Sequence, residues 1–147
     1  MSVIPAKLDS STNPFDSWKS LSISLYMTLA GYAVLVGVPV ISTDWFNLFG
    51  FSEVQVVRVA GADLGGLSVV AVATSLLISS VSRRQIIILG ILIACISNAA
   101  CISIVNYESV LWLRFLAGFG SGLITATAVS CLGASSRPAL AFNAMLF

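Results

Sequence analysis

Four long apolar runs constrain this chain more than any other feature. They cover about residues 21–41, 56–81, 86–105 and 109–132. Each is near or above the roughly 20 residues that an α-helix needs to cross about 30 Å of hydrocarbon. Only helices and closed barrels pair every backbone group in lipid, and these runs lack the alternation of barrel strands. The sequence therefore predicts an all-α integral membrane protein with four transmembrane helices.

The composition agrees with a lipid environment. Hydrophobic residues make up 58% of the 147 residues and charged residues only 9%, whereas a soluble domain carries roughly 25% charged residues. A short soluble chain has too much surface to hide so many apolar side chains. The net charge is +1 and there is no long basic run, which argues against nucleic acid as a partner. We expect the lipid bilayer to be the main partner.

The segments that flank the runs differ in character. Residues 1–20 are polar and contain prolines and several serines, which predicts a flexible tail. The run that follows is too long for a signal peptide, whose apolar region spans about 7–15 residues. At the other end, residues 138–147 are apolar apart from Asn143. Nine helical residues rise only about 14 Å, so we expect a partial fifth span, with a short interfacial tail as the alternative.

Charged residues between the runs predict the orientation. The basic residues Lys7, Lys19, Arg83, Arg84 and Arg137 fall in alternate loops, and the other loops carry Asp44, Glu53 and Glu108. Basic loops face the cytoplasm, so the N-terminus is predicted to be cytoplasmic. Residues 42–55 form the longest linker. The aromatic residues Trp18, Trp45, Phe46, Tyr107 and Trp112 lie near the ends of the runs, where we expect them to anchor at the membrane interface.

Two charges lie deep inside the runs, whereas Arg58 lies just inside the second run, near the interface, where a long side chain can reach water. Asp63 is in the second run and Arg114 in the fourth, and each costs about 2.5–3.5 kcal/mol at a helix centre on insertion scales. Both runs are predicted to cross in the same direction, and the two residues lie about seven and five positions from the outer ends. An ion pair is therefore possible if the helices touch. The functional interpretation is a substrate or proton-coupling site, and the alternative is a pair that only locks helices together.

Small and polar residues predict how the helices pack. Gly61 and Gly65 are spaced by four in the second run, and Gly118, Gly120 and Gly122 follow one another in the fourth. Small residues let helix backbones approach closely in lipid, so we expect these glycines to lie at helix contacts. Polar residues inside the third run, Ser97 and Asn98, mark either a cavity face or hydrogen bonds between helices.

The residues of enzyme sites are missing from the sequence. There is no histidine, which removes the commonest general base and metal ligand. The spacing of Cys95, Cys101 and Cys131 fits neither a zinc site nor a redox pair. We therefore expect no catalytic residues, no metal and no cofactor.

The segment 114–122, Arg-Phe-Leu-Ala-Gly-Phe-Gly-Ser-Gly, resembles the fourth-helix motif of the major facilitator superfamily. Residues 61–66 resemble the small-residue second helix of its bacterial members. Arg83 and Arg84 occupy the place of the basic pair in the loop between helices two and three, and the resemblance extends over about residues 21–147. In that loop the family usually carries an Asp and a Gly. Ser79 and Ser82 stand in their places here.

The resemblance implies a secondary transporter of a small solute, of unknown identity, in the bacterial inner (plasma) membrane. Members have about twelve helices in two halves, with the solute bound between them. The chain would then be the N-terminal portion, about helices 1–4 and the start of helix 5, and would need the missing C-terminal helices for transport. By the same resemblance, Arg114 would bind substrate or take part in proton coupling.

Two other functions stay open at this point. A small four-helix multidrug transporter places an essential carboxylate in its first helix, but residues 21–41 contain no acidic residue. A membrane assembly or regulatory subunit without transport activity is the second alternative. In that case Asp63 and Arg114 would serve only to hold the helices together.

Overall fold

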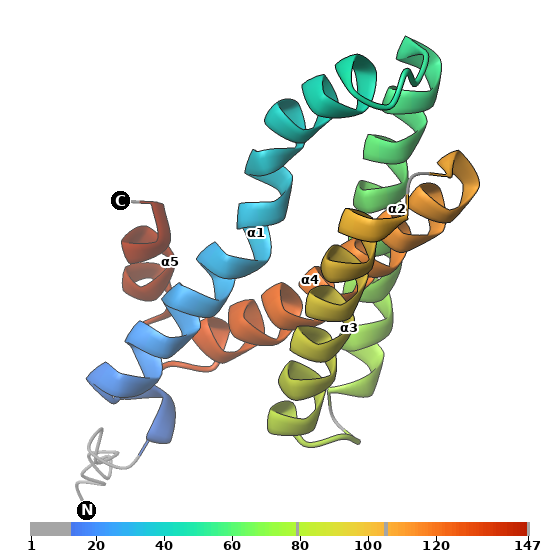
Figure 1. The fold of residues 1–147 in the computed structure, drawn as a ribbon. Coiled ribbons are helices and arrows are strands. Elements are labelled where there is room, and N and C mark those ends of the chain that lie inside the picture. Colours follow the sequence, from blue (N-terminus) through green and yellow to red (C-terminus); the bar gives the residue numbers. More distant parts are fainter. Residues whose placement is uncertain (1–12, 79, 105, 147) are drawn as a thin grey trace, which may run out of the picture.

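The computed structural model describes residues 13–78, 80–104 and 106–146 (Figure 1). Its elements are a short 3₁₀ turn, η2 (Pro14–Asp16), and five helices: α1 (Trp18–Asn47), α2 (Glu53–Leu77), α3 (Arg83–Ser103), α4 (Tyr107–Gly133) and α5 (Pro138–Leu146). The first four are long and apolar enough to cross a membrane, as predicted. Residues 1–12, most of the predicted tail, lie outside the described residues.

Helix α1 is longer than the predicted span. It begins at Trp18 rather than residue 21 and ends at Asn47 rather than residue 41. Ser17 caps its start, because the Ser17 hydroxyl accepts a hydrogen bond from the Ser20 N–H at 3.1 Å. Near the other end, the hydroxyls of Ser42 and Thr43 donate to backbone carbonyls four residues earlier, at 2.7 and 3.2 Å. These polar residues therefore continue the helix, and part of the predicted 42–55 linker is helical.

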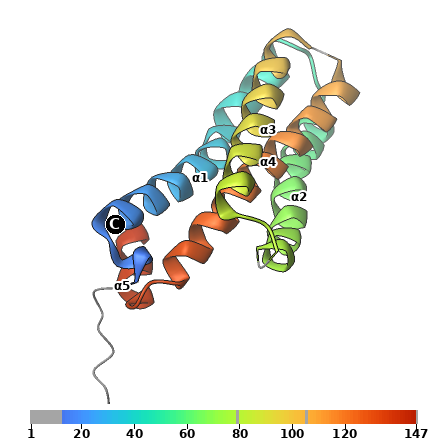
Figure 2. The same ribbon diagram turned by 90° about the horizontal axis from the view of Figure 1, so that it is seen from below.

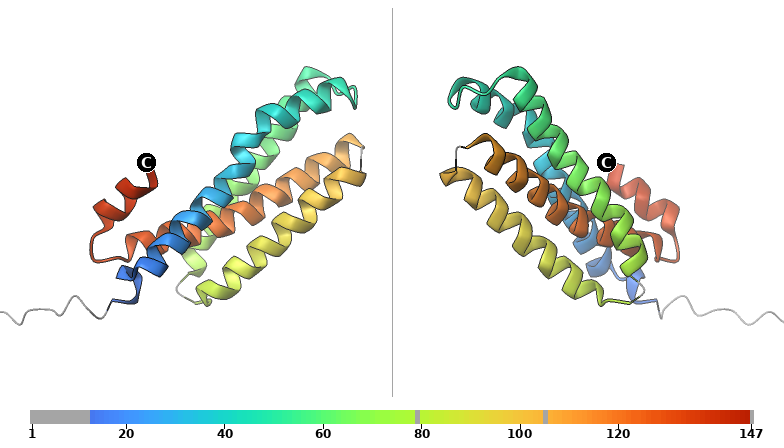
Figure 3. Two further views of the ribbon diagram at one scale, coloured as in Figure 1. Left: turned by 60° about the vertical axis from the view of Figure 1, so that its left-hand side comes forward. Right: turned by 90° about the vertical axis from the view of Figure 1, so that its right-hand side faces the viewer.

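Helix α4 is the central element of the bundle. It packs against α1, α2 and α3 (Figures 1 and 3), and 61% of its span is buried, against 17–22% of the other three. Large apolar side chains on those three helices are exposed, including Ile23, Leu29, Val57, Val72 and Ile96. Outward-facing apolar side chains of this kind are what a lipid environment requires. Helix α5 folds back beside the first turns of α1 (Figure 2).

The glycines of α4 are at the helix contacts. A Cβ added to Gly118 would clash with the Asp63 carbonyl of α2, and one added to Gly122 would clash with Val70 of the same helix. A Cβ on Gly120 would clash with the backbone of Ala94 on α3. These glycines thus let α4 approach two helices closely.

The prediction for Gly61 and Gly65 is wrong within the described part of the chain. A Cβ at either position would meet no atom within 4 Å there, whereas one at Gly66 would clash with the Phe115 carbonyl of α4. The buried face of α2 runs through Val59, Asp63, Gly66 and Val70, at the spacing of successive helical turns. Gly61 and Gly65 lie off that face, which a four-residue spacing alone does not reveal.

Candidate buried charge site

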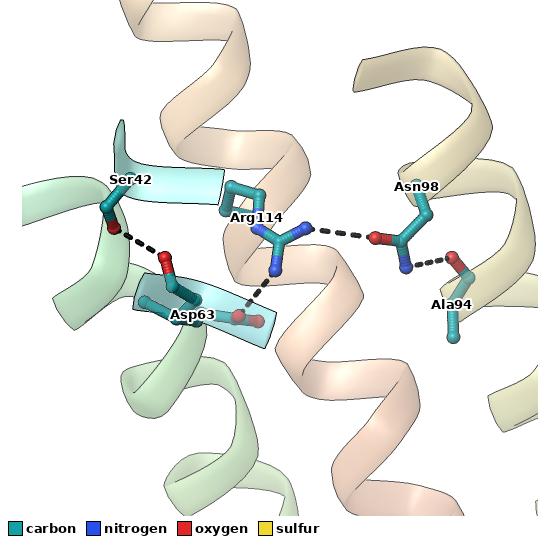
Figure 4. A network of polar contacts seen from close by, with 6 residues as sticks. Ser42, Asp63, Ala94, Asn98 and Arg114 are labelled. Atoms are coloured by element: carbon teal, nitrogen blue, oxygen red, sulfur yellow. Dashed lines mark hydrogen bonds and ion pairs between the residues drawn. The ribbon is translucent and has the colours of Figure 1, made fainter. Parts of the chain in front are cut away.

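A buried ion pair joins α2 to α4. The Arg114 Nη2 atom lies 2.6 Å from Asp63 Oδ2, and the two side chains are only 2% and 7% exposed (Figure 4). Asp63 comes from the face of α2 that packs on α4, directly against Gly118. The two residues that the sequence places at similar depth are thus in contact. A charge-assisted hydrogen bond of this length is among the stronger polar contacts in a protein.

Asn98 connects the same guanidinium to α3. Its Oδ1 accepts a hydrogen bond from Arg114 Nη1 at 2.9 Å, and its Nδ2 donates to the Ala94 carbonyl at 2.7 Å (Figure 4). Both ends of the amide are therefore used, which fixes its orientation. The sequence marks Asn98 only as a polar residue within an apolar run. Its spacing from Arg114 does not predict the contact.

Helix α1 contributes Trp45 to the site. The Arg114 Cζ atom lies 5.6 Å from the centroid of the Trp45 ring, within the range of a cation–π interaction. The expectation that Trp45 anchors at the membrane interface is wrong, because its side chain is only 5% exposed and packs with Phe51, Val59 and Val110. The cause is the extra length of α1, which carries Trp45 into the bundle. One guanidinium thus contacts three other helices.

The ion pair is incompletely bonded. Asp63 Oδ1 and Arg114 Nε are buried and have no hydrogen-bond partner among the described residues. Most buried polar atoms in proteins are paired. Asp63 also lines a cavity of about 140 Å³ between α1, α2 and α4, with Gly31, Gly118 and Ser121. Each member of the pair can therefore form at least one further hydrogen bond.

A larger cavity between α1, α2 and α4 has several hydroxyls in a mostly apolar lining. Its volume is about 460 Å³, and its polar lining residues are Tyr32, Thr74, Ser75, Thr125 and Ser130. The hydroxyls of Ser75 and Thr125 donate to their own helix backbones, at 2.7 and 2.9 Å, so their oxygens remain available as acceptors. The Thr74 hydroxyl is buried without a partner among the described residues. None of the residues that line this cavity is charged.

The basic pair Arg83 and Arg84, predicted to lie in the loop between the second and third runs, forms the start of α3, and its two side chains differ in exposure. Arg83 is half-buried, and its Nη1 lies 3.9 Å from Cys131 Sγ on α4. Arg84 is exposed. In the described segments, no three His, Cys, Asp or Glu side chains gather where they could hold a metal ion.

Comparison with known families gives one match. The model of the family described as "Sugar (and other) transporter" matches residues 9–144. No curated protein and no solved structure gives a significant match. The matched stretch includes all four long helices and nearly all of α5.

Proposed function

The chain belongs to the sugar (and other) transporter family of the major facilitator superfamily, and from that premise we propose that Asp63 and Arg114 form the coupling site of a solute transporter. The family consists of transporters rather than enzymes, and the chain is an integral membrane protein with a small solute as its substrate. The observation that carries the proposal is the buried ion pair, which is held by a single close contact and leaves a buried polar atom without a partner on each residue, within the part of the chain that the structure describes.

A bidentate and fully bonded pair would leave no buried polar atom for a further partner, unlike this pair. Here a proton or a solute group can take the free Asp63 oxygen without disrupting the bundle. If Asp63 became neutral, Arg114 would lose its counter-charge but would still be held by Asn98 and Trp45. The guanidinium keeps its proton under all conditions. The pair can therefore change its net charge from zero to +1 at a fixed place, as coupling requires.

The larger cavity between α1, α2 and α4 supports a neutral polar solute. It offers donors and acceptors from α1, α2 and α4, and no charged residue lines it. Its volume of about 460 Å³ lies in the range of small-molecule sites. The cavity has walls from these three helices only, so we propose that further helices complete it and are needed for transport. We also propose a bacterial inner membrane with the N-terminus in the cytoplasm, on the distribution of basic residues.

Equilibrium binding in lipid nanodiscs tests this function. The probes are radiolabelled glucose and inositol, with glucuronate as the charged comparison. We expect the neutral probes to bind, and Thr74→Val to weaken their binding about fivefold to tenfold, the typical effect of one lost hydrogen bond. Ser68→Ala is the matched control, because it removes an exposed hydroxyl from the same helix. Preferential binding of glucuronate would contradict the neutral-solute proposal.

Uptake into vesicles tests the role of the ion pair. Under an imposed pH gradient, we expect the chain alone to bind probe without accumulating it. Accumulation that Arg114→Gln abolishes would support the coupling role and overturn the need for further helices. If the parent chain does accumulate probe and Arg114→Gln leaves that accumulation unchanged, the pair is only structural, and a membrane assembly or regulatory subunit becomes the better interpretation.

A further inference from the structure

The segment that precedes α1 folds back onto one end of the bundle. Residues 13–17, called the strap below, contain the η2 turn. Asn13 Nδ2 donates to the Ala134 carbonyl at 3.1 Å and to Ser136 Oγ at 3.3 Å. Asp16 Oδ1 accepts from the Ser136 N–H at 2.7 Å. The strap is thus bonded to the turn between α4 and α5, more than a hundred residues along the chain.

The strap also reaches the start of α3. The Arg83 Cζ atom lies 4.6 Å from the centroid of the Phe15 ring. The same guanidinium contacts Cys131 near the end of α4. Arg83 is therefore held between the strap on one side and α4 on the other.

Local chemistry gives the strap a defined shape. Asn13 Oδ1 accepts from the Phe15 N–H at 3.1 Å, so the amide caps η2 with its oxygen and uses its nitrogen for the α4–α5 turn. Pro14 has a fixed φ angle, which limits the freedom of the segment. Asp16 places a carboxylate just before α5, where the helix dipole favours negative charge. Hydrogen bonding to the side chain and backbone of Ser136 lowers the pKa of Asp16.

We propose that the strap is a conformational latch that ties the inner ends of α1, α3, α4 and α5 together and must release before this end of the bundle can open. Asn13, Phe15 and Asp16 make four contacts. Three of these contacts are to residues 134–136 and the fourth is to Arg83. The strap thus links the start of α3 to the α4–α5 turn. The link from opening to transport rests on the proposed function, whereas the latch itself does not.

The rate at which the Cys131 thiol is labelled measures how often the strap is released. The parent for this test keeps Cys131 and carries Cys95→Ala and Cys101→Ala. Because Arg83 lies between Phe15 and Cys131, release of the strap should expose the thiol to N-ethylmaleimide. We expect Asp16→Ala or Phe15→Ala to raise the labelling rate about tenfold, the effect of one charge-assisted contact on an equilibrium. Asp16→Asn, which keeps an acceptor for Ser136, should stay within about twofold of the parent.

Lys19→Ala is the matched control, because it removes an exposed charge one turn away from the strap. Equal labelling rates in the parent, Asp16→Ala, Phe15→Ala and Lys19→Ala would overturn the latch. A second test does not depend on these variants folding normally. In a chain with all three native cysteines replaced by alanine, the pair Asn13→Cys and Ser136→Cys should form a disulfide with copper phenanthroline. The pair Ser17→Cys and Glu108→Cys, at opposite ends of the bundle, should not.

The latch and the proposed function fail in different ways. If no neutral probe binds in nanodiscs but Asp16→Ala still speeds labelling, the proposed function is wrong and the latch stands. If probe binds but neither strap variant changes labelling and the Asn13–Ser136 pair does not cross-link, the latch is wrong and the proposed function stands.

Discussion

The strongest prediction concerns the coupling free energy between Asp63 and Arg114. Arg114→Gln removes the guanidinium and leaves the Asp63 carboxylate only 7% exposed without its partner. Breaking a buried pair on one side typically costs about 3–5 kcal/mol, because one uncompensated charge stays behind. The hydrogen bond to Asn98 is lost as well, which adds about 1 kcal/mol. We therefore expect Arg114→Gln to lower the free energy of unfolding by about 5 kcal/mol.

The reverse change leaves a different residue unpaired. In Asp63→Asn the buried Arg114 stays charged, because a guanidinium does not give up its proton, but Asn98 and Trp45 still hold it. We expect Asp63→Asn to lower the free energy of unfolding by about 3 kcal/mol. The double variant Asp63→Asn with Arg114→Gln leaves no buried charge. It should be at least about 2 kcal/mol more stable than the sum of the single effects implies.

Reversible unfolding in mixed micelles, followed by circular dichroism, measures all four proteins of this cycle. Arg58→Ala serves as the control, because Arg58 is an exposed charge on α2 and should change the stability by less than about 0.5 kcal/mol. If the single effects add in the double variant within about 0.5 kcal/mol, the two charges do not stabilise each other. That result would refute the ion pair as the basis of the site.

Three further predictions concern the packing of α2 on α4, the contact of Trp45 with Arg114, and Asp16 of the strap. Gly118→Val should lower the unfolding free energy by several kcal/mol, since its side chain would meet the Asp63 backbone, whereas Gly61→Val should have little effect; thermal unfolding of both variants checks the contrast. Trp45→Leu should leave the fold intact but weaken the Arg114 site by about 1 kcal/mol, measured as a smaller coupling energy in the same cycle. The lowered pKa of Asp16 means that its contact stabilises the fold above the ordinary value of 3.8 and is lost as the pH falls through the lowered pKa. The difference in melting temperature between wild type and Asp16→Ala should therefore vanish in strong acid, and a difference that grows there would contradict this sign.

The sequence predicts the number and type of the helices because each run must satisfy its own backbone in lipid. It also predicts that Asp63 and Arg114 lie at similar depth, because the number of residues from the end of each helix gives the distance along the helix axis. It does not predict which face of a helix meets which neighbour. Gly61 and Gly66 differ by five residues and lie on different faces, and only the packing of α2 on α4 shows which one is buried.

The site residues that the sequence misses depend on contacts between distant segments. Trp45 enters the site because α1 continues past its most apolar stretch, through Ser42 and Thr43, whose hydroxyls bond to their own helix backbone. Asn98 is visible as a polar residue in an apolar run, but its partner is set by the approach of α3 to the glycines of α4. The periodicity of hydrophobic residues predicts neither contact.

The reach of one guanidinium from α4 to three other helices restricts how this bundle can move. A helix that turns by one residue rotates its side chains by about 100°, which would carry Arg114 away from Asp63, Asn98 and Trp45 together. Helix α4 therefore has no low-energy rotation of its own. Any change of shape at this level either moves the parts of the four helices around Arg114 as one rigid piece or breaks all three contacts at once.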